Sequence, residues 1–306
     1  MSDSDAASVR DEQRERQRRR HLLGVKLRAL VGDHVGSGSA VGEPLDFAPG
    51  SALVTGTHGW VYLDDRPAER LGASLAWALR REVDALHVVA ESGTGVLARR
   101  AAEFDMPISV WHAHERSLVE AVAEPITPPP AVPEHHEIFR SLIADGGAVP
   151  VAEHGVLTGE VRGLEVCRVV DDHHTGATRL EVGVGEHDRE AFQMLHGDVP
   201  AVESLARVVE TVARHRTPGA SQHPLNTLAA ERLLRWRLEQ EPGLVGATHV
   251  EPGEPPVRRR NLKDATPCVA LGTTDAGEPL VVVCSAGVDL DLVPYAADAR
   301  LARGGA

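Results

Sequence analysis

A proline-rich segment, EPITPPPAVPE at residues 124–134, is the feature that most constrains the fold of this chain. Consecutive prolines favour the polyproline II conformation, which makes no internal hydrogen bonds and builds no core. One hydrophobic core therefore cannot run through this segment, and 306 residues are enough for two domains. We expect an N-terminal arm at 1–50, a small domain at 51–124, a linker at 125–134 and a second domain at 135–306.

The pattern of the first domain predicts an α/β fold. Apolar runs at 85–90 (ALHVVA) and 108–113 (ISVWHA) are typical of buried strands, and two further short strands flank a turn near 57–59. Between them, apolar residues recur at helical spacing, as in Leu71, Leu75, Ala78 and Leu79. Strands that alternate with helices indicate a sheet covered by helices. We expect a Rossmann-like or nuclease-like three-layer domain.

The second domain reads as a strand-rich α+β domain, so the fold class of the whole chain is mixed α/β. Alternation in TRLEVGVG and the apolar runs GLEVCRVV and AVPVAEHG predict strands. Helical patterns occur at 136–144, 187–196, 199–215 and 224–240. Two apolar runs, CVALG and PLVVVCS, flank the turn residues TTDAGE and predict a hairpin.

The N-terminal arm is basic. Residues 1–20 are highly charged and are expected to be disordered, and residues 36–50 are expected to be a flexible linker. Between them, Leu23, Leu27, Leu30 and Val31 fall on one face of a helix. Residues 10–28 contain eight Arg and Lys against three acids, or about +5. We expect this helix to pack on its own domain or to self-associate, and the alternatives are that it binds a protein partner or an anionic surface.

Composition excludes several classes of protein. The formal charge is −13, so the chain outside the basic arm carries about −18, which argues against general nucleic-acid binding. Cys167, Cys268 and Cys284 are far apart and form no CxxC motif, so no structural zinc is expected and a reducing, cytoplasmic location is predicted. No signal peptide and no membrane span of ~20 apolar residues is present.

A glycine-containing loop offers a candidate nucleotide site. Gly93, Thr94 and Gly95 follow a predicted strand and open a predicted helix, in the pattern Gly-x-Gly-x-x-Ala. Such loops bring backbone close to a pyrophosphate at a helix N-terminus. Glu115 lies about 20 residues further on, where a ribose-binding acid would stand. The alternative is a strand-to-helix turn, and Glu91 before the loop would repel phosphate.

Three carboxylates near the end of the sequence offer a candidate Mg²⁺ or Mn²⁺ site. If residues 288–292 are extended, Asp289 and Asp291 point to one face, roughly 6–7 Å apart at Cα. Asp298 could join them from a following helix. Three carboxylates can hold a divalent ion that promotes phosphodiester hydrolysis. The alternative is a solvated strand face, since the acids alternate with Val288, Leu290 and Leu292.

Catalytic motifs with well-defined spacing are absent. The chain has two lysines, Lys26 and Lys263, and neither completes the Glu-x-Lys pair of PD-(D/E)XK nucleases or a Walker A loop. Glu165, Glu181 and Arg168 are the strand residues that could replace such a pair. The GxSxG nucleophile motif is also absent. Arg258, Arg259 and Arg260 form a compact basic cluster that could bind phosphate or an acidic partner.

The sixteen histidines include three pairs that merit attention. His112 and His114 share a face of a predicted strand, a spacing that can bind zinc. The pairs His135-His136 and His173-His174 are adjacent in sequence. Adjacent side chains diverge on a helix or strand, so we do not expect either of these pairs to share a metal.

Five blocks of the chain carry a family resemblance: GEVRGLEVCRVV, RLEVGVGEHDREAFQMLHGD, HPLNTLAAERLLR, NLKDATPCVALGT and VVVCSAGVDLDLVPYAADARL. They resemble a group of uncharacterised actinobacterial proteins, and the first domain is similar too. The resemblance implies no activity and transfers no catalytic residue. Such relatives run on beyond the AADAR block, so the resemblance implies that a last strand-helix unit is either missing here or supplied by a partner.

The sequence leaves three hypotheses open for function. The leading one is a non-catalytic binding or interaction protein that recognises a nucleotide-like ligand in the first domain. The second is a metal-dependent phosphodiesterase or nuclease-like enzyme using the acidic cluster. The third is an oligomeric scaffold assembled through the N-terminal helix.

Overall fold

The computed structural model describes residues 3–36, 40–172, 175–189, 200–217, 220 and 223–304, with side chains from residue 14 onward except Arg16. The chain divides into two compact units, and the expected mixed α/β class is confirmed. Unit 1 comprises Met1–Ile126 and Leu290–Asp298, and unit 2 comprises Thr127–Asp289 and Ala299–Ala306. The segment Leu290–Asp298 thus belongs to unit 1, whereas the sequence pattern assigned it to the second domain.

Unit 1 is built on a six-stranded sheet whose spatial order follows the sequence, β1 to β6. The three central strands are parallel to one another, and the outer pairings are antiparallel. Parallel neighbours require crossover connections, which the chain supplies as helices. The strands are β1 (Leu45–Phe47), β2 (Gly50–Thr55), β3 (His58–Leu63), β4 (Ala85–Ala90), β5 (Ile108–His114) and β6 (Ser117–Glu120).

Helices cover both faces of this sheet, which confirms the expected three layers. The crossover helices α2 (Leu71–Arg81) and α3 (Thr94–Ala101), with the short helix η1 (Pro67–Glu69), lie on one face. Helix α1 (Asp3–Val35) lies on the other. Strand residues alternate between these two cores, so that Val61 faces α2 and α3 whereas Trp60 faces α1.

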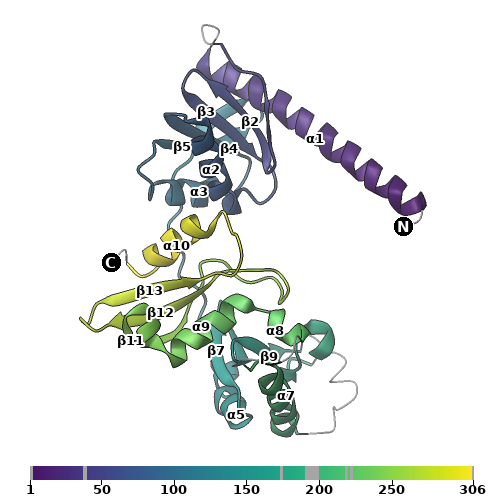
Figure 1. The fold of residues 1–306 in the computed structure, drawn as a ribbon, viewed down its shortest axis with the longest axis vertical. Helices are drawn as coiled ribbons and strands as arrows, with labels where there is room; N and C mark the ends of the chain where they lie inside the picture. The colour runs from purple at the N-terminus through teal and green to yellow at the C-terminus, as the bar shows by residue number, and fades with distance from the viewer. Residues whose placement is uncertain are drawn as a thin grey trace. The chain divides into compact units, whose positions relative to one another are not determined.

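Helix α1 is longer than the sequence pattern predicted. Leu27, Leu30 and Val31 are buried against the sheet, and Leu23 packs beside them, as expected. The expectation that residues 1–20 are disordered is wrong, because the helix begins at Asp3. Ala, Arg, Glu and Gln dominate this stretch and favour helix, and no Gly or Pro interrupts it before Gly24. The N-terminal part of α1 extends beyond the sheet (Figure 1).

Unit 2 contains two antiparallel sheets. The first is a four-stranded meander in the order β10-β9-β8-β7, packed against α5 (Phe139–Asp145) and α7 (Ala201–His215). The second is a three-stranded sheet in the order β11-β12-β13, packed against α9 (Ala230–Gln240). The strands are β7 (Val149–Glu153), β8 (Val156–Val161), β9 (Leu164–Asp171), β10 (Thr178–Val182), β11 (Ala247–Gly253), β12 (Cys268–Thr274) and β13 (Pro279–Cys284). Shorter helices are α4 (Glu134–Glu137), α8 (Pro224–Thr227) and η2 (Pro242–Val245).

Several local expectations need correction. The helix expected at 224–240 is two helices, because Ala229 adopts a left-handed conformation with φ 48° between α8 and α9. The linker expected at 36–50 contains β1, which pairs with β2. Residues 288–292, expected to be extended, lead through a turn into α10 (Leu292–Leu301). Most of the helix expected at 187–196, and His173 and His174, lie outside the described residues.

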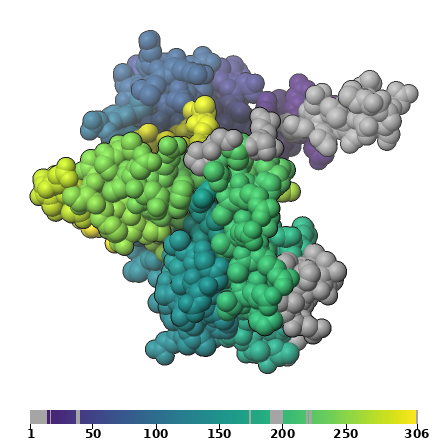
Figure 2. Space-filling view, turned by 60° about the horizontal axis from the view of Figure 1, so that its bottom comes forward, coloured from purple at the N-terminus to yellow at the C-terminus, as the bar shows by residue number. Residues whose placement is uncertain are grey.

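A buried ion network fixes α9 on the four-stranded sheet, and Figure 2 shows green residues around α9 alongside the teal residues of that sheet. Arg232 and Arg235 each donate to both Glu153 and Glu160. Glu160 is only 4% exposed. Burial by itself would raise the pKa of the Glu160 carboxyl, but the Arg235 and Arg232 guanidiniums outweigh it and hold that pKa at about 2.

Candidate functional site

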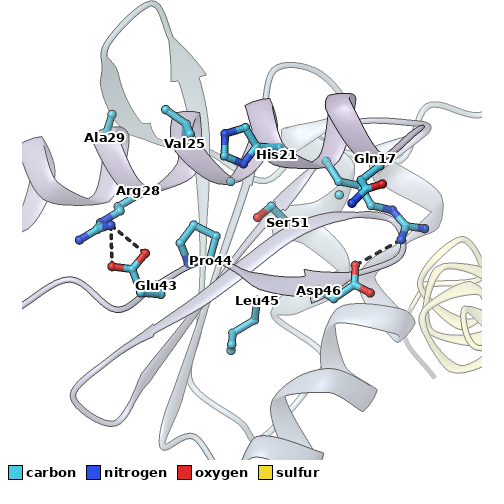
Figure 3. A pocket seen from close by; sticks show the side chains of 13 residues that line it. Gln17, His21, Val25, Arg28, Ala29, Glu43, Pro44, Leu45, Asp46 and Ser51 are labelled. Atoms are coloured by element: carbon cyan, nitrogen blue, oxygen red, sulfur yellow. Dashed lines mark hydrogen bonds and ion pairs between the residues drawn. The ribbon is translucent and has the colours of Figure 1, made fainter. Parts of the chain in front are cut away.

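An open groove of about 1050 Å³ lies between α1 and the β1–β2 hairpin of unit 1. Its volume is at the upper end of the range of ligand pockets in proteins. The helix forms one wall and the start of β1 with the near end of β2 forms the other (Figure 3). The lining residues are Gln17, Arg20, His21, Gly24, Val25, Arg28 and Ala29 on α1, and Glu43, Pro44, Leu45, Asp46, Gly50 and Ser51 on the hairpin side.

Small residues determine the shape of this groove. A Cβ atom on Gly24 would lie 2.8 Å from the Cβ of Pro44, so glycine lets α1 approach the chain before β1. A Cβ on Gly50 would lie 1.9 Å from the carbonyl oxygen of Tyr62, so that position in β2 also requires glycine. Gly50 and Ser51, two small residues at this end of β2, line the space under the helix.

Two ion pairs cross the groove. Arg20 Nη1 lies 3.3 Å from an Asp46 oxygen, and Arg28 Nη1 lies 2.7 Å from a Glu43 oxygen, as the dashed lines in Figure 3 mark. The four side chains are between 47% and 81% exposed. Ion pairs exposed to this extent stabilise a fold by only about 0–1 kcal/mol each. An incoming charged group can therefore replace either pairing at little cost.

The helix wall is anchored by an aromatic cluster on the sheet face beneath it. His87 stacks on Trp60 with ring centroids 4.0 Å apart, and His34 of α1 contacts Trp111 edge-on at 4.5 Å. Trp111 Nε1 donates to His87 Nδ1 at 3.1 Å, so in neutral His87 the proton is on Nε2, which faces His58 Nδ1 at 2.9 Å.

This arrangement keeps His87 neutral. Burial, reinforced by repulsion from His58 and His34, lowers the pKa of His87 to about 4. A second proton would also displace the Trp111 hydrogen bond. The neutral His87 ring and the two tryptophans thus form part of the sheet face under the C-terminal half of α1.

The glycine loop predicted as a nucleotide site lies at the start of α3. Gly93 caps the helix with φ 64°, and α3 begins at Thr94. A Cβ on Gly95 would lie 2.7 Å from the Cβ of Glu124, whose backbone N–H donates to the Gly95 carbonyl at 3.0 Å. The glycine is explained by this close packing, and a Glu124 carboxylate oxygen would lie 3.2 Å from the same Cβ.

The remaining residues of that prediction do not add a phosphate site. Glu91 pairs with Lys26, so a further carboxylate stands beside the loop. Glu115 occupies the exposed turn between β5 and β6, with φ 52°. The geometry of unit 1 therefore explains residues 93–95 as a strand-to-helix turn.

The acidic cluster is held by arginines. Asp298, 2% exposed, accepts two hydrogen bonds from Arg99 at 2.9 and 3.1 Å and one from Arg100 at 2.7 Å. Asp291 accepts from Arg100 at 3.0 Å and from the Gly72 backbone N–H at 2.8 Å. Asp289 lies in the other compact unit. With Asp291 and Asp298 paired to the buried Arg100, and Asp298 also to the partly exposed Arg99, these three acids give no support to the predicted Mg²⁺ or Mn²⁺ site.

The residues considered as nuclease substitutes belong to a second arginine network. Glu165, 2% exposed, accepts from Arg168, Arg189 and Arg259 at 3.0–3.1 Å. Burial opposes ionisation, but these guanidiniums hold the pKa of Glu165 below its usual range.

The other charged residues considered for a nuclease-like or phosphate site are Glu181 and the cluster Arg258, Arg259 and Arg260. Glu181 pairs with Arg179 at 2.8 Å. Of the predicted basic cluster, Arg259 is thus a structural partner of Glu165, and Arg258 and Arg260 are exposed. No free catalytic carboxylate remains among the residues named for this site.

Among the described residues, His112 and His114 do not belong to a group with metal-binding geometry. Such geometry occurs instead at His135, His136 and Asp171, although we expected the adjacent side chains of His135 and His136 to point apart.

No model of a known protein family matches this chain, and no curated protein or solved structure is significantly similar to it. Among the described residues, no helix combines the length and apolar character needed to cross a membrane. The groove itself was not predicted, because its second wall was expected to be a linker.

Proposed function

We propose that this protein is a non-catalytic binding protein whose unit 1 docks an acidic segment of a partner polypeptide in the groove between α1 and the β1–β2 hairpin. The observation that carries the proposal is the wall of the groove, where Arg20, His21 and Arg28 line about 1050 Å³ of open space. The opposing acids Glu43 and Asp46 hold these arginines only through exposed ion pairs.

The shape of the groove favours a polypeptide over a small metabolite. Small-molecule sites usually enclose most of their ligand. This groove instead follows about three turns of helix, from Gln17 to Ala29, and its far wall is a strand edge. Val25, which lines it, is 54% exposed, so an apolar contact is available beside the arginines. An elongated occupant with acidic and apolar side chains fits this surface.

Charge selects the class of partner. The arm from residue 10 to residue 28 carries about +5, whereas the rest of the chain carries about −18. A nucleic acid presents a dense row of phosphates and would be repelled by the acidic remainder. A short acidic segment meets the basic wall of α1, where it competes with Glu43 and Asp46 of the opposite wall for the arginines. Electrostatic attraction of this kind mainly speeds association and selects the partner.

The test is a fluorescence anisotropy titration with a labelled peptide of alternating Glu and Val. The double variant Arg20→Glu/Arg28→Glu should weaken binding by about tenfold or more, since two favourable charge contacts become repulsive. The variant Glu43→Gln/Asp46→Asn should bind more tightly than the wild type, because the peptide no longer competes with internal acids. The variant Arg80→Glu/Arg81→Glu changes net charge equally at exposed positions of α2 and should bind like the wild type.

Four results would contradict the proposal. Equal affinity of the two Arg→Glu double variants would show that only net charge matters. Weaker binding by Glu43→Gln/Asp46→Asn would show that these acids do not compete with the peptide. Tighter binding of a labelled single-stranded oligonucleotide than of the peptide would identify the wrong class of partner. A doubled mass in sedimentation that Arg20→Glu/Arg28→Glu abolishes would replace the foreign partner by a second copy of this chain.

A further inference from the structure

Three potential metal ligands meet in unit 2, where α4 lies beside the end of β9. His135 Nε2 and His136 Nε2 lie 3.2 and 3.0 Å from the same oxygen of Asp171. One nitrogen or oxygen of each residue lies within 4.8 Å of the others. Among the described residues, this is the group of His, Cys, Asp and Glu side chains with such geometry.

The local fold explains how adjacent histidines converge. Pro133 precedes α4, a single turn of helix, and the His136 backbone N–H donates to the Pro133 carbonyl at 2.8 Å. The two imidazole rings meet edge to face with centroids 4.5 Å apart. Their outer nitrogens therefore reach one carboxylate although their Cα–Cβ bonds diverge. Asp171 is the last residue of β9 and pairs across the sheet with Thr178.

The spacing agrees with metal coordination. Zinc bonds to His nitrogen and carboxylate oxygen are about 2.0–2.2 Å long, so neighbouring ligands of a tetrahedral site are about 3.3 Å apart. Both measured N···O separations are within about 0.3 Å of that value. A metal would replace the hydrogen bonds to Asp171, and the two nitrogens, which lie within 4.8 Å of each other, would be about 3.3 Å apart around it.

Burial and hydrogen bonding also suit a site that is held on one side and open on the other. The His136 side chain is 9% exposed, whereas His135 and Asp171 are 57% and 45% exposed. Thr178 Oγ1 donates to Asp171 at 2.7 Å and orients the carboxylate. No described group hydrogen-bonds to the buried His136 Nδ1. The open side leaves room for water or a further ligand.

We propose that His135, His136 and Asp171 form a binding site for one divalent transition-metal ion of the zinc class. Two imidazoles and one carboxylate suit Zn²⁺, Co²⁺ or Ni²⁺ rather than Mg²⁺ or Ca²⁺, which prefer oxygen ligands. The bound ion joins the first turn of unit 2 to its four-stranded sheet, across 35 residues of sequence. The proposal is independent of the groove in unit 1.

The test uses tag-free full-length protein, stripped with a chelator and titrated with Co²⁺, whose visible absorption reports coordination by nitrogen. One equivalent should bind, and Zn²⁺ should displace it. His135→Asn removes the most exposed ligand and Asp171→Asn removes the shared carboxylate. Each variant should weaken Co²⁺ binding by at least about tenfold.

The double variant His112→Asn/His114→Asn is the matched control, since it removes two histidines of unit 1 and should keep the wild-type spectrum and stoichiometry. Far-ultraviolet circular dichroism without metal should be the same for all variants, which separates loss of ligand from loss of fold. Absence of a one-equivalent Co²⁺ spectrum in the wild type would overturn the proposal. An unchanged spectrum in His135→Asn and Asp171→Asn, or its loss in the control, would also overturn it.

Discussion

Protonation of His87 should weaken the docking of α1 in acid, and the size of the effect follows from the cluster around the ring. The pKa of His87 falls from its ordinary value of 6.5 to about 4 because the ring is half-buried against Trp60 and faces His58 and His34. Between these two values the unfolded chain binds more protons than the folded one. The contribution of the neutral His87 ring to the free energy of unfolding is therefore complete above about pH 6.5, and it is lost as the pH falls toward 4.

The two pKa values set the magnitude. A pKa difference of one corresponds to about 1.36 kcal/mol of free energy. The fall from 6.5 to about 4 therefore changes the free energy of unfolding by at most about 3.4 kcal/mol. The ring is only half-buried, and screening by solvent reduces the expected loss to about 1–2 kcal/mol.

The assay is urea unfolding followed by tryptophan fluorescence from about pH 7 to about pH 4.5, since Trp60 and Trp111 both contact the His87 ring. The variant His87→Gln cannot titrate, so its free energy of unfolding should fall less steeply with acid than that of the wild type. The exposed His114→Gln serves as control and should follow the wild type. Parallel curves for wild type and His87→Gln would refute the reasoning.

Three further substitutions test the packing described above. Leu27→Ala removes a fully buried anchor of α1 and should lower the free energy of unfolding by about 2–5 kcal/mol in urea, whereas the exposed Leu22→Ala should change it by no more than about 0.5 kcal/mol. Glu160→Gln leaves Arg232 and Arg235 with one carboxylate fewer, so the free energy of unfolding measured by calorimetry should fall by about 3–5 kcal/mol. An unchanged unfolding transition would show that the network does not hold α9 on the sheet. Gly95→Ala should lower the free energy of unfolding by about 1–3 kcal/mol, seen as a lower Tm, because the new methyl group collides with Glu124. If the wild type bound a nucleotide and the variant kept its stability but lost that binding, the phosphate-loop hypothesis would be restored.

Periodic patterns predicted much of unit 1. Apolar runs located β4 and β5, and helical spacing located the anchoring face of α1 at Leu27, Leu30 and Val31. These features depend on local sequence, which determines which side of an element is buried. The reach of α1 to Asp3 was missed because a polar helix has no apolar stripe that marks it, although its residues favour helix.

The candidate sites were harder to predict because they depend on distant contacts. Asp291 and Asp298 read as free carboxylates in the sequence, but Arg100, about 190 residues earlier, binds both. His135 and His136 read as divergent neighbours, and the sequence does not show that Asp171, 35 residues after His136 at the end of β9, lies within reach of both. Gly95 matched a phosphate-loop pattern, and the residue that explains it, Glu124, lies beyond two intervening strands.

Site-specific photo-cross-linking from the groove tests the central claim most directly. A benzophenone amino acid replaces Val25, which lines the groove and is 54% exposed, and in a parallel protein it replaces Leu244 of η2 in unit 2, which is 61% exposed. Peptides joined to position 25 in extracts of the source cells should be acidic, and their yield should fall in the Arg20→Glu/Arg28→Glu background. The same peptides joined at both positions, or capture at position 25 that is unaffected by the charge reversal, would contradict docking in this groove.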